Sequence, residues 1–288
     1  MSNDMHTDVQ RPPIREPMKR AIRQRCGFGC IFCGEPLYVY HHIALYSDER
    51  VHEQENITLL CDKHHRRFHN GLLSEQQIRN QNDHPLNLQG EFSPPFDLLY
   101  EGDKIDFTLG DVRFQDANCS ADYQAIIIDD IPLLSVRFEE KHPLISVQVF
   151  DTDDRLTVYI RDNELVFKLD HWDVEFEGNR LTIRTDSREI YFIARFQPPD
   201  KITIEKAIFV VNRIVLIVRG RGFHLLNRGT IWEGLTVESP RAGLIITRHA
   251  TSPFESAVVM NNTTPYTSAE ECRNAIREAT RHKPRRGR

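Results

Sequence analysis

Cysteines and histidines gather in one short stretch of this 288-residue chain. Within it lie two ligand-type pairs, Cys30-x2-Cys33 and Cys61-x2-His64, about thirty residues apart. Thiolates and imidazoles at this spacing are typical of a tetrahedral structural zinc site. A segment this small buries too little apolar surface to fold alone, so Zn²⁺ would act as a staple. The spacing predicts a small zinc-bound module in the first third of the chain.

Two other interpretations of these residues compete with this one. Cys26 is a rival fourth ligand in place of His64, although its gap of three residues to Cys30 is less usual. The four residues could also be buried and unliganded, but so regular a spacing rarely arises by accident. Four of the six cysteines lie in this window, whereas a secreted disulfide scaffold would spread them in pairs. We therefore favour zinc with His64 as the fourth ligand.

Local patterns place the cluster on a strand, a loop, a second strand and a helix. Residues 37–40 form a short apolar segment, residues 56–60 form another, and residues 63–70 have helical character. Gly71 follows as a helix C-cap. Ser74-x-x-Gln77 is a capping box that starts a further helix.

Four more histidines fall in register with the zinc pairs. His41 and His42 adjoin each other at the end of the first strand, and neighbouring strand residues point to opposite sides. His65 and His69 are four apart and share one helix face. His41, His65 and His69 could therefore hold one divalent cation with coordination positions left open for water and a phosphate oxygen. His42 would remain as a general base, because an imidazole pKa of about 6.5 suits neutral pH.

Asn56 does not titrate, so we expect its side chain to hydrogen-bond and to fix the loop that carries His42. The competing interpretation is that the histidines are surface residues of a zinc knuckle. Any one of them alone would favour that interpretation. Four in register with two ligand pairs favour catalysis.

Residues 26–73 resemble the HNH endonuclease family, the ββα-metal nucleases, in a form with a zinc ribbon. The matching segments read Cys30-Ile-Phe-Cys33-Gly34, Tyr40-His41-His42-Ile43, Glu55-Asn56-Ile57-Thr58-Leu59-Leu60-Cys61 and His64-His65-Arg66-Arg67-Phe68-His69. The letters of the family name fall on His42, Asn56 and His65. Many zinc-bearing members have Asp where His41 stands and Cys where His64 stands. The remainder of the chain is not recognised.

The resemblance implies catalytic roles for His42, Asn56 and His65. His42 would activate the attacking water, and Asn56 would keep the first loop in shape. Mg²⁺, Mn²⁺ or another divalent ion on His41, His65 and His69 would stabilise the phosphorane and the leaving 3′ oxygen. The products would carry a 5′-phosphate and a 3′-hydroxyl.

Charge indicates where a polyanion would bind. The net charge is −5, but residues 11–34 hold six Lys or Arg against one Glu, and residues 271–288 hold seven against two. Residues 81–270 are acidic by eleven, so contact with a polyanion would fall to the ends. The expected partner is nucleic acid, double-stranded DNA in the first instance. The candidate phosphate contacts are Arg23, Arg25, Arg66 and Arg67. The alternative for Arg66 and Arg67 is that they only decorate a helix.

The remainder of the chain predicts a second, β-rich domain. Apolar and polar residues alternate over residues 156–160, 165–169, 172–176, 181–183 and 190–196, with turn residues between them. Many short strands at such spacing indicate a sandwich, a barrel or a solenoid. The apolar run 208–218 predicts a strand buried on both faces, and residues 269–280 predict a helix.

The predicted fold is α+β: a small N-terminal ββα-metal HNH module, then a predominantly antiparallel β domain, sandwich or solenoid-like, and a short C-terminal helix. The expected boundaries are a disordered N-terminus at 1–16, the module at 17–82, a linker at 83–100, the β domain at 101–266 and a basic helix and tail at 267–288.

The predicted function is a metal-dependent DNA endonuclease that uses one metal ion and a histidine base, with bacterial anti-phage defence or restriction as its setting. The β domain would serve homo-oligomerisation, targeting, or sensing of a regulatory ligand or partner protein. The alternative is a zinc-stabilised nucleic-acid-binding or adaptor protein without turnover. Since there is no run of eighteen apolar residues and no apolar segment in the polar N-terminus, we expect a cytoplasmic protein without membrane contact.

Overall fold

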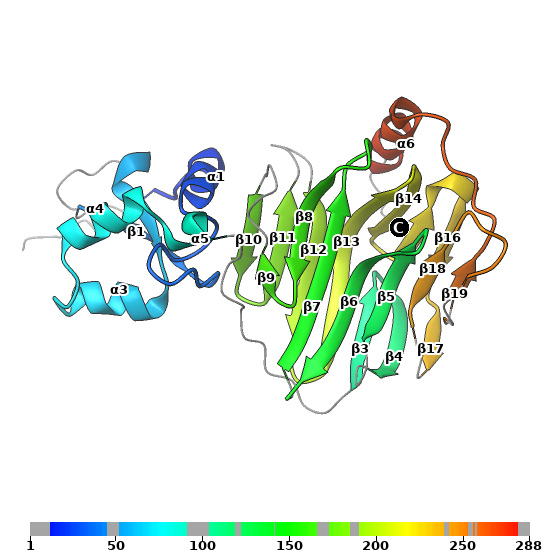
Figure 1. The fold of residues 1–288 in the computed structure, drawn as a ribbon, viewed down its shortest axis with the longest axis horizontal. Coiled ribbons are helices and arrows are strands. Elements are labelled where there is room, and N and C mark those ends of the chain that lie inside the picture. The colour runs from blue at the N-terminus through cyan, green and yellow to red at the C-terminus, as the bar shows by residue number, and fades with distance from the viewer. Residues whose placement is uncertain are drawn as a thin grey trace, which may run out of the picture.

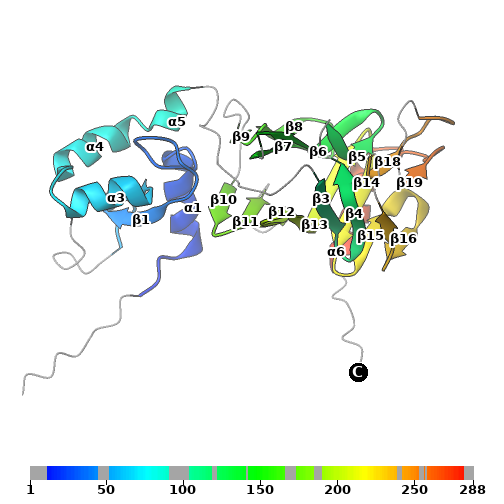
Figure 2. The ribbon, with the colours of Figure 1, turned by 90° about the horizontal axis from the view of Figure 1, so that it is seen from below.

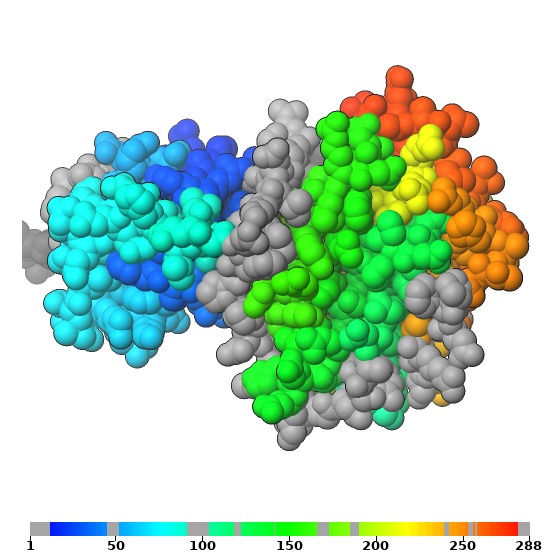
Figure 3. Space-filling view, viewed as in Figure 1, coloured from blue at the N-terminus to red at the C-terminus, as the bar shows by residue number. Residues whose placement is uncertain are grey.

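The chain folds into a small module followed by a larger β-sandwich. The computed structural model describes residues 12–44, 52–90, 104–118, 122–140, 142–165, 173–184, 190–238, 242–252, 256 and 258–281. The module, residues 12–90, and the sandwich, residues 104–281, lie side by side along the long axis (Figure 1). The space-filling view shows the module as a separate lobe at one end of the sandwich (Figure 3). Each has its own cluster of buried apolar side chains within the described ranges.

The module consists of short elements around one antiparallel strand pair. They are α1 (Glu16–Arg25), β1 (Val39–His42), η1 (Gln54–Asn56), β2 (Ile57–Leu60), α3 (Asp62–His69), α4 (Glu75–Asp83) and α5 (Leu86–Gln89). In the β1–β2 pair, Val39 lies opposite Leu60 and His42 lies opposite Ile57. Because α3 begins two residues after β2 ends, the helix is held against this pair. The module thus has the predicted order of strand, loop, strand and helix.

Local sequence signals fix the ends of two helices. The capping box is confirmed: the Ser74 side chain accepts from the Gln77 amide at 3.2 Å, and the Gln77 side chain accepts from the Ser74 amide at 2.9 Å. Gly71 follows α3 with a φ of +70°, a conformation that glycine adopts without strain. Pro17 lies in the first turn of α1, where a missing amide hydrogen costs nothing.

The prediction of a linker over residues 83–100 is wrong for its first part, residues 83–90. Helix α5 packs on the module, because the Leu86 amide donates to the Ile31 carbonyl at 2.9 Å. The side chain of Asn87 is buried and donates to the carbonyls of Gly27 and Gly34 at 2.9 and 3.1 Å. Pro85 stands at the N-cap of this short helix. Residues 91–103 lie outside the described residues, as do residues 1–11 of the expected disordered N-terminus.

Two sheets form the larger body. The ten-stranded sheet of the described residues contains β3 (Lys104–Leu109), β4 (Val112–Asn118), β10 (Asp173–Glu177), β11 (Arg180–Arg184), β12 (Ile190–Gln197), β13 (Lys201–Val211), β14 (Ile214–Arg219), β15 (Gly222–Leu225), β16 (Thr230–Glu233) and β17 (Thr236–Glu238). The seven-stranded sheet described beside it contains β5 (Tyr123–Ile128), β6 (Ile131–Glu139), β7 (His142–Phe150), β8 (Leu156–Arg161), β9 (Glu164–Leu165), β18 (Leu244–Ile246) and β19 (Val258–Met260). The expected strand over 165–169 lies mostly outside the described residues.

The sheets pack face to face, so the architecture is a sandwich rather than a barrel or solenoid. Their inner faces share one apolar cluster, and Figure 2 shows the two layers edge-on. In the first sheet the order is β10-β11-β12-β13-β14-β15-β16, while β3 joins β13 to β4 and β4 pairs with β17. In the second the order is β19-β18-β5-β6-β7-β8-β9. Most pairs are antiparallel, which confirms the predicted mixed α+β class with mainly antiparallel sheets.

The single strand predicted over 208–218 is a hairpin. Strands β13 and β14 are joined by Asn212 and Arg213, whose φ angles are +47° and +62°. Two consecutive positive φ angles are those of a type I′ turn, which matches the twist of the strands it joins. Arginine is an unusual residue for this turn, so the sequence does not reveal the break. The flanking segments are buried, as their apolar run predicts.

The predicted C-terminal helix is confirmed as α6 (Ala269–Arg281). It buries Cys272 and Ile276 against the sandwich near β14. Residues 282–288 lie outside the described residues. In the described part of the chain, no helix has both the length and the apolar character to cross a bilayer.

Candidate metal centres

The two cysteine pairs of the sequence converge on one point. Cys30 Sγ and Cys61 Sγ lie 3.4 and 3.2 Å from His64 Nδ1, and Cys33 Sγ lies 3.6 Å from Cys61 Sγ. All four ligand atoms lie within 4.8 Å of one another. Tetrahedral Zn²⁺, with Zn–S of about 2.3 Å and Zn–N of about 2.0 Å, separates its ligands by about 3.5–3.8 Å. This group, the cysteine site, can therefore hold a metal such as zinc.

Backbone geometry presents the ligands. Gly34 has a φ of +75°, and a Cβ on Gly29 would stand 2.3 Å from the Gly34 carbonyl, so the knuckle around the first Cys pair needs both glycines. Cys61 is the N-cap residue of α3, which places His64 in the first turn of this helix. The His64 ring stacks on the Phe32 ring with 5.1 Å between the ring centroids.

The pKa values of the three thiols shift in different directions, because the thiols lie against one another. The hydrogen bond with Cys33 lowers the pKa of Cys30, and the same bond together with burial raises the pKa of Cys33. Burial raises the pKa of Cys61. Thiols this close resist collective ionisation, and a bound metal ion supplies the positive charge that favours the thiolates.

Cys26 does not belong to this group. Its sulfur is buried and lies 3.6 Å from the hydroxyl of Thr58. Burial raises its pKa, as expected for a thiol that packs in a core. The structure therefore favours His64 over Cys26 as the fourth ligand.

A second group, the histidine site, brings together His41 of β1 with His65 and His69 of α3. The Nε2 atoms of His65 and His69 lie 3.2 Å apart, and the His41 ring lies edge-on to both, at centroid distances of 5.3 and 6.1 Å. Each of the three rings offers one nitrogen within 4.8 Å of the others. Among the described residues, the buried Nε2 of His41 has no hydrogen-bond partner. Because an orphaned buried nitrogen is costly, a cation shared with the two neighbouring rings fits this arrangement.

The surroundings of His41 and His65 favour the neutral imidazole, which is the form that binds metal ions. Burial lowers the pKa of His41 to about 4, and the charges of His65, His69 and His42 contribute to this shift. Burial and the neighbouring His69 also lower the pKa of His65. His41 is buried, whereas His69 is exposed, so the site opens to solvent on the α3 side.

His42 and Asn56 lie next to this group. His42 follows His41 directly on β1, and its Nε2 lies 3.0 Å from His52 Nδ1. Asn56 holds the chain two residues beyond His42, since its Oδ1 accepts from the Ala44 amide at 2.8 Å and its Nδ2 donates to the Ala44 carbonyl at 3.4 Å.

His52 is a residue of the site that sequence reasoning does not identify. It lies in a charged loop and has no helical or strand spacing to the other ligand-type residues. The only signal in the sequence is that it is a ninth Cys or His between residues 30 and 69.

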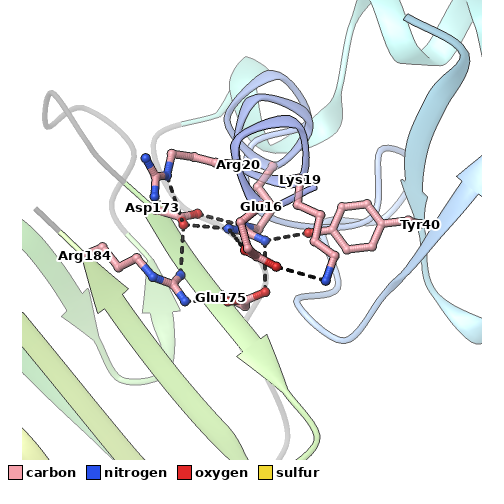
Figure 4. A network of polar contacts seen from close by, with 8 residues as sticks. Glu16, Lys19, Arg20, Tyr40, Asp173, Glu175 and Arg184 are labelled. Carbon is pink, nitrogen blue, oxygen red and sulfur yellow. Dashed lines mark hydrogen bonds and ion pairs between the residues drawn. The ribbon is translucent and has the colours of Figure 1, made fainter. Parts of the chain in front are cut away.

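Arg23 lies at the contact between the module and the sandwich. Arg23 is 0% exposed and pairs through two nitrogens with Asp173 of β10, at 2.6 Å each. Its third nitrogen lies 2.9 Å from Glu175 and donates to the Tyr40 hydroxyl at 2.6 Å. Arg184 bonds the same two carboxylates from the other side at 2.9 and 3.0 Å. Figure 4 shows these carboxylates on β10, facing α1 and Tyr40.

Two of the four arginines predicted to contact phosphate are otherwise engaged. The prediction that Arg23 contacts nucleic acid is wrong, because its whole side chain is buried in this ion network. Arg25 is half-buried and donates to the backbone carbonyls of Gln54 and Ile57. Its guanidinium therefore stabilises the start of β2 and is not available to a phosphate. Arg66 and Arg67 are exposed on α3.

No protein-family model matches this chain, and neither a curated protein nor a solved structure matches it significantly. The geometry of the two sites therefore carries the functional conclusion.

Proposed function

We propose that this protein is a metal-dependent endonuclease of the HNH type that hydrolyses DNA phosphodiester bonds. The observation that supports this most strongly is the histidine site, three imidazole nitrogens within 4.8 Å of one another on a face open to solvent. A fourth histidine, His42, follows His41 directly on the same strand. A separate cysteine site ties the strand pair to the helix that carries the other two ligands.

His41, His65 and His69 would hold a divalent ion such as Mg²⁺ or Mn²⁺. That ion supplies Lewis-acid stabilisation of the negative charge that develops on the phosphate and on the leaving 3′ oxygen. The lowered pKa values of His41 and His65 favour this role, because a ligand imidazole must be unprotonated.

His42 and Asn56 would supply the remaining catalytic roles, which are to deprotonate the attacking water and to position the base. His42 takes a proton from the attacking water, and the oxygen that remains forms a bond to phosphorus as the bond to the 3′ oxygen breaks. Asn56 keeps the backbone after His42 in place through its two bonds to Ala44. The products are a 5′-phosphate and, once the leaving 3′ oxygen takes a proton from solvent water, a 3′-hydroxyl.

Arg66 and Arg67 would position the duplex. They lie on α3 beside the ligands His65 and His69, and their side chains are exposed. Contacts of arginine with phosphate give affinity and orientation without reading the sequence.

A plasmid-nicking assay tests the proposal. The zinc-loaded protein is expected to nick supercoiled DNA when Mg²⁺ or Mn²⁺ is added, and His42→Ala is expected to lose about 10²–10⁴-fold in rate, the usual contribution of a general base. His84→Ala is the matched control, since His84 is an exposed histidine of the same module outside both sites. Nicking by His42→Ala at the wild-type rate would refute the base assignment.

The alternative function gives a different result in the same assay. A zinc-stabilised nucleic-acid-binding protein without turnover would bind DNA in a salt-sensitive manner, would cut it with none of the divalent ions, and would not respond to His42→Ala. That outcome would contradict the proposed nuclease.

A further inference from the structure

We infer that His52 is a positioning residue for His42, which it holds in one tautomer with the basic lone pair on Nδ1. The inference rests on the proposed function for its catalytic meaning, but the tautomer itself can be measured without any turnover. Two contacts carry it: His42 Nε2 lies 3.0 Å from His52 Nδ1, and His52 Nε2 lies 2.6 Å from the carbonyl oxygen of Pro12.

The direction of these hydrogen bonds follows from the last acceptor. A carbonyl oxygen only accepts, so His52 Nε2 must carry the hydrogen that it donates to Pro12. A neutral His52 then has a bare Nδ1, which only accepts. His42 must therefore donate from Nε2, and when it is neutral its lone pair lies on Nδ1.

The backbone is restrained at both ends of this chain of hydrogen bonds. Pro12 is followed by Pro13, and a residue before proline is restricted to extended conformations, which limits the orientations open to the Pro12 carbonyl. On the other side, Arg25 bonds the Gln54 and Ile57 carbonyls and fixes the segment that follows His52. Arg25 therefore helps to position His52, although its guanidinium is not available to a phosphate.

This arrangement suits a base in the proposed reaction. When His42 Nδ1 accepts the proton of the attacking water, the ring becomes an imidazolium that still donates from Nε2 to His52. A hydrogen bond from a charged donor is stronger than a neutral one, so this bond strengthens as the base is protonated. Removal of His52 leaves His42 able to adopt the other tautomer, in which the proton already occupies Nδ1.

The test compares His52→Leu, which lacks an acceptor, with His52→Asn, whose amide oxygen can accept near the position of Nδ1. His84→Leu is the matched control. Long-range proton–nitrogen spectra of the zinc-loaded protein, with ¹⁵N-labelled histidine and at a pH well above the ordinary imidazole pKa, report which nitrogen of His42 carries the proton. We expect Nε2–H in the wild type, His52→Asn and His84→Leu, and a mixture of tautomers in His52→Leu.

The kinetic readout separates positioning from binding. Plasmid nicking by His52→Leu is expected to fall on the order of 10-fold or more in kcat with an unchanged KM, because the substitution leaves the DNA-binding side chains in place. His52→Asn should retain activity within a few-fold of the wild type.

Several results would overturn the inference. They are an Nδ1–H tautomer of His42 in the wild type, an unchanged tautomer in folded His52→Leu, and an unchanged kcat in that variant. If His52→Leu fails to fold, the wild-type spectrum and His52→Asn still decide. Should the wild type not cut DNA at all, the proposed function fails while the spectra still test the tautomer.

Discussion

At the scale of single residues, surroundings rather than residue type assign the roles of the cysteines. Cys26 and Cys61 are both buried, yet Cys61 Sγ lies 3.2 Å from His64 Nδ1 whereas Cys26 contacts Thr58. The spacing of the sequence leaves Cys26 as a rival ligand. The fold decides against it, because the Cys26 sulfur lies against Thr58 and Asn82 and does not join the four ligand atoms that converge.

This difference predicts the zinc content of two matched variants. Cys61→Ala is expected to lose the structural zinc and to destabilise the module, because the remaining ligands no longer complete a tetrahedron. Cys26→Ala also removes a buried sulfur, and its zinc content should stay at about one per chain with a modest decrease in stability of about 1 kcal/mol. Elemental analysis and thermal unfolding measure both. Loss of zinc from Cys26→Ala alone would reverse the ligand assignment.

How far the sequence predicts single residues depends on the range of their interactions. Helical spacing predicts that His65 and His69 share a face, and strand alternation predicts that His41 and His42 diverge. His52 cannot be placed from the sequence, because its position depends on a loop with no periodicity. Arg23 is misassigned because its partner Asp173 lies 150 positions away.

At the scale of elements, α3 combines three roles on one short helix. His64 faces the cysteine site, His65 and His69 form part of the histidine site, and Arg66 and Arg67 project outward. An α-helix turns about 100° per residue, so adjacent positions separate these roles without any break in the helix.

The outward face of α3 gives a prediction about DNA binding. The double variant Arg66→Ala/Arg67→Ala should weaken binding uniformly across sequences and reduce the slope of log affinity against log salt by about 2, close to one unit for each phosphate that is no longer neutralised. Arg79→Ala is the control, since Arg79 on α4 pairs with Glu75 at 2.7 Å. Fluorescence anisotropy at several salt concentrations measures the slope. An unchanged slope in the double variant would exclude α3 as the phosphate-binding surface.

Elements with local signals can be predicted, and those without them cannot. The capping box of α4 and the glycine after α3 mark helix ends that the structure confirms. The β13–β14 hairpin resembles one strand in the sequence because Asn212 and Arg213 lack the glycine that usually marks such a turn. Helix α5 resembles a linker because its stability comes from the buried Asn87 side chain, not from the helix propensity of its four residues.

At the scale of the whole molecule, the ion network around Arg23 joins the module to the sandwich. Burial would lower the pKa of Arg23, but its hydrogen bonds to Asp173 and the charges of Asp173 and Glu175 raise it, so the guanidinium stays charged. Tyr40, whose hydroxyl accepts a hydrogen bond from Arg23, directly precedes His41. The network therefore reaches the strand that carries the histidine site.

The network predicts that removing one partner of the buried ion pair destabilises the protein more than removing both. Asp173→Leu leaves Arg23 buried without its main partner and should destabilise the protein by about 3–5 kcal/mol. The double variant Arg23→Met/Asp173→Leu should cost less than the single one, because no uncompensated charge remains. The exposed pair gives the control: Glu75→Ala should cost less than about 1 kcal/mol. Denaturant unfolding measures all three, and a double variant that is no more stable than Asp173→Leu would contradict a buried-charge origin.

The general architecture is predictable, because alternating apolar residues reveal strands, and turn residues separate them. The choice of a sandwich and the docking of β10 against α1 are not predictable, since both depend on packing between segments that lie far apart in the sequence.

The most direct measurement of the central claim is the rate of plasmid nicking by the zinc-loaded protein as a function of Mn²⁺ concentration. The account predicts no nicking without added divalent ion and a saturating dependence on one Mn²⁺ per chain. In His69→Ala the midpoint should rise roughly 10-fold or more, while the zinc content stays at about one per chain. Nicking that is independent of Mn²⁺, or a midpoint that His69→Ala leaves unchanged, would contradict it.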